Sequence, residues 1–139
     1  MPESGPPPDD RPLIAIVDDE PVITHFVAAV GDRSRRFHTV VGHDGLDAVA
    51  LRFGSPEPDA MVLNGAMPGM NGLEALDIIR ERERSEGRPR LPIALETAWA
   101  HHERLASEHG ADASIGKPFS QEELLRLVES LLALRARQD

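Results

Sequence analysis

Five polar side chains of the sequence follow short apolar runs and could meet in one site. They are the carboxylates of Asp18 and Asp19, the amide of Asn64, the hydroxyl of Thr97 and the ammonium of Lys117. The amide ends the apolar run in MVLNGAMPGMNG (61–72), where a strand often delivers a catalytic carboxylate. An amide cannot act as a nucleophile there, because its nitrogen lone pair is delocalised and its oxygen is uncharged. The sequence therefore predicts a charged pocket whose central side chain is chemically inert.

Alternating strands and helices are predicted to position these residues. Short aliphatic runs are typical of strands covered on both faces, and apolar residues at helical spacing lie between them. The expected strands are 13–17, 37–41, 60–63, 91–95 and 113–115, and the expected helices are 21 to about 30, 44–53, 72–87, 101–110 and a last helix after Ser120. This alternation predicts an α/β fold, a parallel sheet with helices on both faces. Functional residues of such folds lie at the carboxyl ends of the strands, where we expect the five polar residues to meet.

The ends and faces of two helices can be predicted in more detail. Pro21 suits the first turn of a helix, and Val22, Phe26 and Val30 are expected to form its buried face. Ser120 and Glu123 have the spacing of a capping box at the start of the last helix.

Each polar residue also has an ordinary interpretation when it is taken alone. The acidic pair could simply favour the start of the following helix. Thr97 could end a strand, and Lys117 could be a surface lysine. Their convergence on one edge of the sheet favours a functional site over five independent coincidences.

Together these segments give the chain its resemblance to a known family. The segments are IVDDEP (16–21), PDAMVLNGAMPGMNG (58–72), TA (97–98), GAD (110–112) and GKPFS (116–120). In this order and spacing they resemble the receiver domain of two-component response regulators. We assign residues 12–137 to this domain and expect residues 1–11, which are rich in proline and acid, to be a disordered leader.

The resemblance implies a flavodoxin-like fold with five parallel strands in the order 2-1-3-4-5. It also implies that Asp18, Asp19 and the backbone carbonyl of Ala66 would hold Mg²⁺. Thr97 would be the switch hydroxyl that contacts a phosphoryl group, and Lys117 would pair with the phosphoryl oxygens. A cis peptide bond is expected before Pro118.

Two positions depart from the family pattern. Asn64 stands where the family has its phosphoacceptor aspartate, and losing that carboxylate should also weaken Mg²⁺ binding. Ser114 stands where an aromatic switch residue is common, and Ser114 is too small to follow Thr97 into and out of an apolar slot. Trp99, two residues after Thr97, is expected to be a lid, a partner contact or a buried anchor.

Glu96 is a third unusual position, because a carboxylate precedes Thr97 where an apolar strand residue is normal. We expect either that the strand ends early and leaves Glu96 in water, or that Glu96 pairs with Arg104 or a histidine.

The expected function is that of a signal-transduction receiver that acts through protein contact and is not phosphorylated at Asn64. The expected partners are a histidine kinase, a phosphotransfer protein or a downstream target, reached through the last helix, or a second copy in a homodimer. The alternative is an ordinary Mg²⁺-dependent receiver in which an aspartate at position 64 was engineered to Asn64 or is restored by deamidation of Asn64-Gly65. A hydrolase of the haloacid dehalogenase type would need Asp-x-Asp after the first strand, which VDDEPV does not supply.

Composition limits the remaining classes. The 139 residues carry 15 Lys and Arg against 24 Asp and Glu, a formal charge of −9 that repels nucleic acid. The sequence has no cysteine, which excludes disulfides and thiolate chemistry. No membrane span or signal peptide is recognisable, so we expect a cytoplasmic protein that is not an enzyme, with no nucleic-acid or membrane partner.

Overall fold

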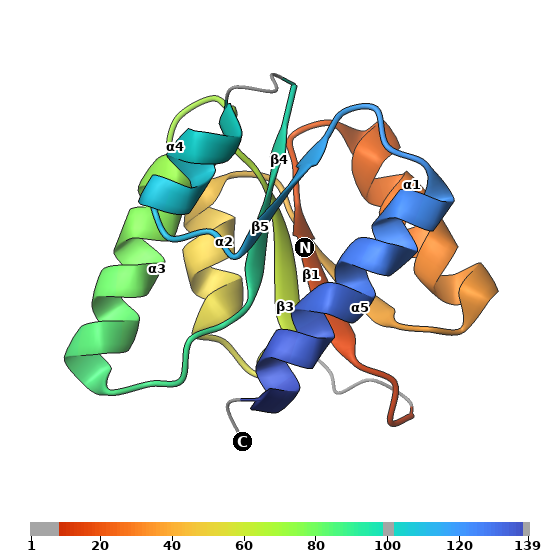
Figure 1. The fold of residues 1–139 in the computed structure, drawn as a ribbon, viewed down its shortest axis with the longest axis horizontal. Helices are drawn as coiled ribbons and strands as arrows, with labels where there is room; N and C mark the ends of the chain where they lie inside the picture. The colour runs from red at the N-terminus through yellow and green to blue at the C-terminus, as the bar shows by residue number, and fades with distance from the viewer. Residues whose placement is uncertain (1–8, 99–101, 138–139) are drawn as a thin grey trace.

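Five strands alternate with five helices in the part of the chain that the computed structural model describes, residues 9–98 and 102–137 (Figure 1). The strands are β1 (Leu13–Val17), β2 (His38–Gly42), β3 (Ala60–Asn64), β4 (Ile93–Thr97) and β5 (Ala113–Gly116). The helices are α1 (Pro21–Ser34), α2 (Gly45–Arg52), α3 (Gly72–Glu86), α4 (His102–Glu108) and α5 (Gln121–Arg137).

The strands form one parallel sheet in the order β2-β1-β3-β4-β5, which confirms the predicted topology. Helices α1 and α5 cover one face, and α2, α3 and α4 cover the other (Figure 1). Every residue of β1, β3 and β4 is buried, because these three strands lie inside the sheet with helices on both sides. Consecutive side chains alternate between the two cores, so the polar residues that end these strands also alternate in direction.

Helix α1 buries a different face from the predicted one. Val22 is 69% exposed and Phe26 is half-buried, so only Val30 of the expected three is in the core. The buried positions are Thr24, Val27, Val30 and Gly31. Thr24 can be buried because its hydroxyl donates to the carbonyl of Pro21 at 3.1 Å. The prediction counted only large apolar residues and therefore missed this face.

The predicted capping box of α5 is confirmed. Glu123 N donates to Oγ of Ser120 at 3.1 Å, and Ser120 N donates to the carboxylate of Glu123 at 3.0 Å. Within the described residues, no helix is both long and apolar enough to cross a membrane. The expected leader and Trp99 fall mainly or wholly outside these residues, so both remain predictions.

Candidate functional site

A cavity of about 240 Å³ opens at the carboxyl edge of the sheet, where the sequence predicted a site. Its lining comes from the ends of β3 and β4, the segments that follow β1, β3, β4 and β5, and the first turn of α3: Glu20, Asn64, Gly65, Ala66, Leu73, Leu95, Glu96, Thr97, Ala98 and Lys117. Asp18 lies beneath this lining with no exposed surface. Four of the five predicted polar residues are thus buried or half-buried around one cavity. The fifth, Asp19, is exposed and accepts a hydrogen bond from Asn64.

The amide of Asn64 is held by four hydrogen bonds. Its Nδ2 lies 3.2 Å from Oδ1 of Asp18, 3.2 Å from Oδ1 of Asp19 and 3.1 Å from the carbonyl oxygen of Ala66. Its Oδ1 accepts from the backbone N–H of Ala66 at 3.3 Å. Only 3% of Asn64 is exposed, so these contacts fix the orientation of the amide. The two N–H groups serve three acceptors at once.

A divalent cation does not fit this arrangement of the pocket. Asp18, Asp19 and Glu20 each offer an oxygen within 4.8 Å of the others, which is the spacing of a cation site. However, Asp18, Asp19 and the Ala66 carbonyl already accept N–H bonds from Asn64. A cation would have to displace a donor from the same oxygens that the resemblance assigns to Mg²⁺, and position 64 supplies no carboxylate to assist it.

Lys117 is surrounded by three carboxylates. Its Nζ lies 3.0 Å from Oε1 of Glu20, 3.0 Å from Oε1 of Glu96 and 3.5 Å from Oδ2 of Asp18. Burial alone would lower the pKa of this ammonium, but its ion pairs with Glu20, Glu96 and Asp18 raise the pKa above its usual value. Lys117 therefore remains charged in the folded protein.

Glu96 is fully buried, so of its two expected environments water is wrong and pairing with a base remains. Strand β4 runs to Thr97 and not to residue 95, and Glu96 faces the α1 and α5 side between Asn64 of β3 and Ile115 of β5. Its basic partner is Lys117, which had not been suggested, and the suggested Arg104 is exposed. The sequence showed that the residue was unusual but could not identify the base across the sheet.

A proton on Glu96 explains how this carboxyl group is tolerated. Neither of its oxygens nor Oδ2 of Asp18 receives a hydrogen bond from the described residues, since Lys117 is close but not aligned. Burial, followed by the hydrogen bond and charge of Asp18, raises the pKa of Glu96 to about 8, although Lys117 opposes this rise. At neutral pH a protonated Glu96 can donate to Asp18 and give both groups a partner.

The remaining predicted residues occupy different places. Thr97 is 5% exposed and lines the cavity, and its carbonyl accepts from the backbone N–H of Lys117 at 2.8 Å. Ser114 is half-buried, opposite Leu95 in the sheet, and is not among the residues that line the cavity. The peptide bond between Lys117 and Pro118 is cis, as expected. Sequence reasoning missed Glu20 as a partner of Lys117, although it directly follows the acidic pair.

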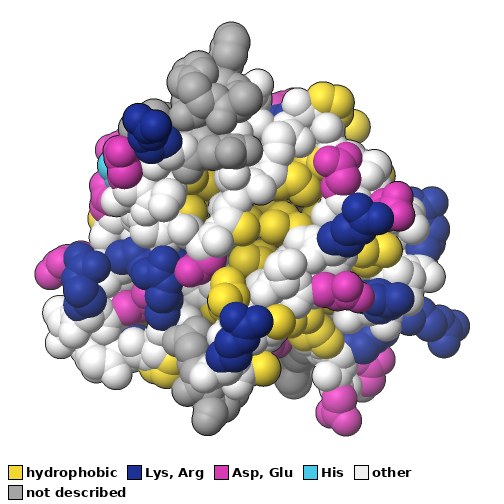
Figure 2. Space-filling model, in the orientation of Figure 1, with side chains coloured by type: hydrophobic (Ala, Val, Ile, Leu, Met, Phe, Trp, Pro, Cys, Tyr) yellow, Lys and Arg dark blue, Asp and Glu magenta, His cyan; other side chains and the backbone are white. Residues whose placement is uncertain are grey.

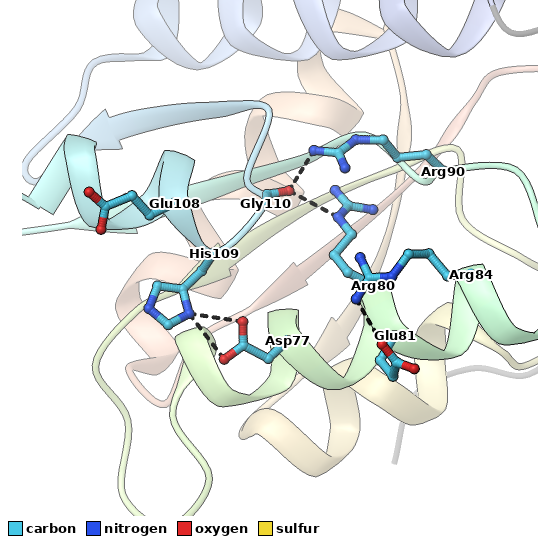
Figure 3. Close-up of a pocket in the computed structure, with 8 residues that line it drawn as sticks. All are labelled: Asp77, Arg80, Glu81, Arg84, Arg90, Glu108, His109 and Gly110. Carbon is cyan, nitrogen blue, oxygen red and sulfur yellow. Dashed lines mark hydrogen bonds and ion pairs between the residues drawn. The ribbon is translucent and has the colours of Figure 1, made fainter.

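A second cavity, of about 420 Å³, lies between α3 and the segment that joins α4 to β5 (Figure 3). Its arginines are already paired. Arg80 and Arg90 both donate to the carbonyl of Gly110, at 2.9 and 2.7 Å, and Arg84 pairs with Glu81. His109 contacts Asp77 at 2.9 Å across the cavity mouth. The cavity therefore offers balanced charges and not an anion site.

Comparisons with known proteins identify the architecture. Residues 14–129 match the response regulator receiver domain. The response regulator MprA of Mycobacterium ulcerans is 38% identical over 124 residues, covering 86% of this chain and 49% of MprA. This chain spans about half the length of most of the curated relatives it matches.

Two solved structures have the same fold. Chemotaxis protein CheY4 of Vibrio cholerae is 22% identical with a TM-score of 0.75, covering 88% of this chain and 100% of CheY4. The receiver domain of sensor histidine kinase PA1611 from Pseudomonas aeruginosa is 25% identical with a TM-score of 0.75, covering 89% of this chain and 99% of that domain. That structure has a magnesium ion coordinated in its active site cleft.

Proposed function

Because the chain belongs to the response regulator receiver domain family, we propose that it signals through protein contact without phosphorylation at Asn64. Receiver domains are the signalling modules of two-component systems. In this receiver the position that would take the phosphoryl group carries an amide, which provides no nucleophile. The fold and the rest of the pocket are retained, so the protein keeps the surfaces by which a receiver meets its partners.

The observation that carries this proposal is the set of contacts made by Asn64. The amide bridges Asp18, Asp19 and the loop carbonyl of Ala66, and so ties together β1, β3 and the loop after β3. The two N–H groups of the amide carry partial positive charge. They offset the repulsion between the two carboxylates, which a cation would otherwise do. The pocket is thereby held in one arrangement without a phosphoryl group or a metal ion.

Mg²⁺ binding is therefore proposed to be weak. The related PA1611 receiver coordinates a magnesium ion in its cleft. In this chain, Asn64 would have to turn its oxygen inward and give up its bond from the Ala66 N–H before it could assist a cation. Mg²⁺ also gives up its bound water reluctantly, which adds to the cost.

The partner surface is proposed to include the last helix. Leu124, Leu127, Val128 and Leu131 of α5 are buried in the core, while Leu125 and Leu132 are only partly covered. Figure 2 shows hydrophobic side chains reaching the surface in the middle of the face that carries β5 and α5. A histidine kinase, a phosphotransfer protein, a downstream target or a second copy of the chain could contact this face. Sedimentation of the protein alone tests the second-copy case, since a self-associating α5 face would be weakened by Leu132→Glu.

Acetyl phosphate provides the direct test of phosphorylation. The unaltered chain and Asn64→Asp are incubated with acetyl phosphate and MgCl2, and the modified residue is located by mass spectrometry. We expect no modification at position 64 of the unaltered chain. Phosphate attached at Asn64 in that chain would overturn the proposed function.

The structure disfavours the alternative in which deamidation restores an aspartate. Deamidation needs the backbone nitrogen of Gly65 to attack the side-chain carbon of Asn64. That nitrogen donates instead to the carbonyl of Glu96 at 3.0 Å, and the Asn64 side chain is fixed by its own hydrogen bonds. Both reacting groups are therefore engaged in other hydrogen bonds, which would have to break first.

A further inference from the structure

The ammonium of Lys117 lies close to three carboxyl groups. Glu96 and Glu20 each place an oxygen 3.0 Å from Nζ, and Asp18 places one at 3.5 Å. An ammonium has three N–H donors. Only Glu20 receives an aligned hydrogen bond, but oxygens of all three carboxyl groups lie close around the ammonium, although Lys117 itself lines the cavity.

Glu96 differs from the other two partners in its position. Glu20 has a side chain that is 54% exposed, and Asp18 is needed by Asn64. Glu96 has no exposed surface and projects from the strand residue beside Asn64, between β3 and β5. It therefore contacts the lysine from inside the sheet, where neither solvent nor a rotamer change can easily release it.

We propose that Glu96 is a positioning residue that holds Lys117 away from the mouth of the cavity and so blocks phosphoryl chemistry independently of Asn64. This inference rests on the proposed function and extends it, because it assigns the inactivity to two residues. Restoring a carboxylate at position 64 would then be insufficient. The lysine would still be held close to the buried carboxyl group of Glu96 and away from the oxygens of an incoming phosphoryl group.

The step in question is a simple transfer. A carboxylate oxygen introduced at position 64 would form a bond to the phosphorus of acetyl phosphate. The bond from phosphorus to the acetate oxygen would break, and acetate would leave with that electron pair. A free ammonium stabilises the charge that gathers on the phosphoryl oxygens during this transfer.

The experiment compares three chains that all carry Asn64→Asp. One has no further change, one adds Glu96→Val and one adds Glu96→Gln. Valine suits a buried strand and has no acceptor, whereas glutamine keeps an oxygen at the same place. Each chain is incubated with acetyl phosphate and MgCl2, and its phosphorylated fraction is followed by intact mass.

We expect the Glu96→Val chain to be phosphorylated at least about tenfold faster than the Asn64→Asp chain, since one well-placed donor is typically worth more than this. The Glu96→Gln chain should react like Asn64→Asp, because its oxygen still holds the lysine. Circular dichroism and thermal unfolding confirm that each chain is folded, and Glu96→Ala replaces Glu96→Val if the valine variant is not.

Lys117 is the only lysine of the sequence, which gives a second readout. Protein labelled with ¹³C and ¹⁵N in lysine alone contains one side-chain ammonium signal to follow by NMR. In the otherwise unaltered chain, Glu96→Val should move this signal toward that of free lysine. Glu96→Gln should leave the signal near its original place.

Equal rates for Asn64→Asp and the Glu96→Val chain would overturn the inference and leave the proposed function intact. Equal acceleration by Glu96→Val and Glu96→Gln would also overturn it, because the effect would then come from charge and not from a held lysine. An unmoved lysine signal in Glu96→Val would do the same. Phosphorylation of the unaltered chain at Asn64 would instead overturn the proposed function.

Discussion

The ammonium of Lys117 lies 3.0 Å from Oε1 of Glu96, a side chain with no exposed surface. This contact joins the residue after β5 to β4 at the lining of the cavity, next to Asn64. Against the family pattern that the sequence resembles, this would be the loss of a carboxylate at position 64 and the gain of one beside it at position 96. The gain is not equivalent to the loss, because a carboxyl group inside the sheet cannot reach an incoming substrate and costs free energy to bury.

Stability should fall as pH rises, because of Glu96. Its pKa is about 8 in the folded protein and 4.5 in an unfolded chain. Below pH 4.5 both states hold the proton, and the contribution of Glu96 is fully present. Between 4.5 and 8 only the unfolded chain releases the proton, so unfolding becomes easier. At about 1.4 kcal/mol per pKa unit, the loss is on the order of 5 kcal/mol once the pH exceeds 8.

Urea unfolding between pH 4 and 9 measures this loss, with Glu96→Gln as the matched control. Glutamine keeps the shape and an acceptor for Lys117 but does not titrate. Subtracting its curve removes the contribution of the other carboxylates. A difference that stays flat between pH 4.5 and 8 would show that Glu96 is ionised throughout and that no proton is shared with Asp18.

Asn64→Asp should destabilise the metal-free protein by roughly 2–4 kcal/mol, because several hydrogen bonds of about 1 kcal/mol are lost and a charge is added beside two carboxylates. The N–H bonds to Asp18, Asp19 and Ala66 would be replaced by oxygens that repel the two acids. The same oxygens would favour Mg²⁺. Thermal unfolding with and without MgCl2 should therefore show a larger rise in Tm for Asn64→Asp than for the unaltered chain.

Asn64→Ala serves as the control for this comparison. It removes the same hydrogen bonds without adding a charge, so it should be destabilised but should gain little from MgCl2. If MgCl2 raised the Tm of the unaltered chain as much as that of Asn64→Asp, the amide would not exclude the cation as its contacts suggest.

Sequence patterns predicted the sheet well because each strand carries its own signal. The aliphatic runs in β1 and β3 specify burial on both sides, and the alternation of strands and helices leaves few topologies. The site needed contacts between strands, which no local pattern describes. The sequence left two environments open for Glu96, water or a base such as Arg104 or a histidine, because a lone buried carboxylate is costly. Lys117, directly after β5, and Asp18, directly after β1, make its burial possible.

The error at Val22 has a related cause. Periodicity gives the spacing of a buried face but not its phase when small or polar residues belong to it. In α1 the core side includes Thr24 and Gly31, and Gly31 is needed because a Cβ there would lie 2.6 Å from the ring of Phe37. Neither residue contributes to an apolar stripe.

Apolar periodicity likewise gives no sign of a buried ion network on the α3 side of the sheet. This network joins α2, α3 and the segment before β4. Glu83 accepts from Arg52 and Arg80, each at 2.8 Å, and from the backbone N–H of Leu91 at 2.9 Å. All three charged side chains are about 95% buried or more. Glu83 and the two arginines pair with each other inside the protein, so each charge needs the others to remain in place.

Removing the anion of this network should therefore be costly. Glu83→Ala would leave the guanidinium groups of Arg52 and Arg80 buried beside one another, and breaking such a group typically costs about 3–5 kcal/mol. Glu81→Ala removes an exposed partner of Arg84 in the same helix and should change stability by about 0.5 kcal/mol or less. Urea unfolding of the two variants at neutral pH gives the comparison. Similar losses for Glu81→Ala and Glu83→Ala would mean that helix propensity, and not the buried network, determines the stability of α3.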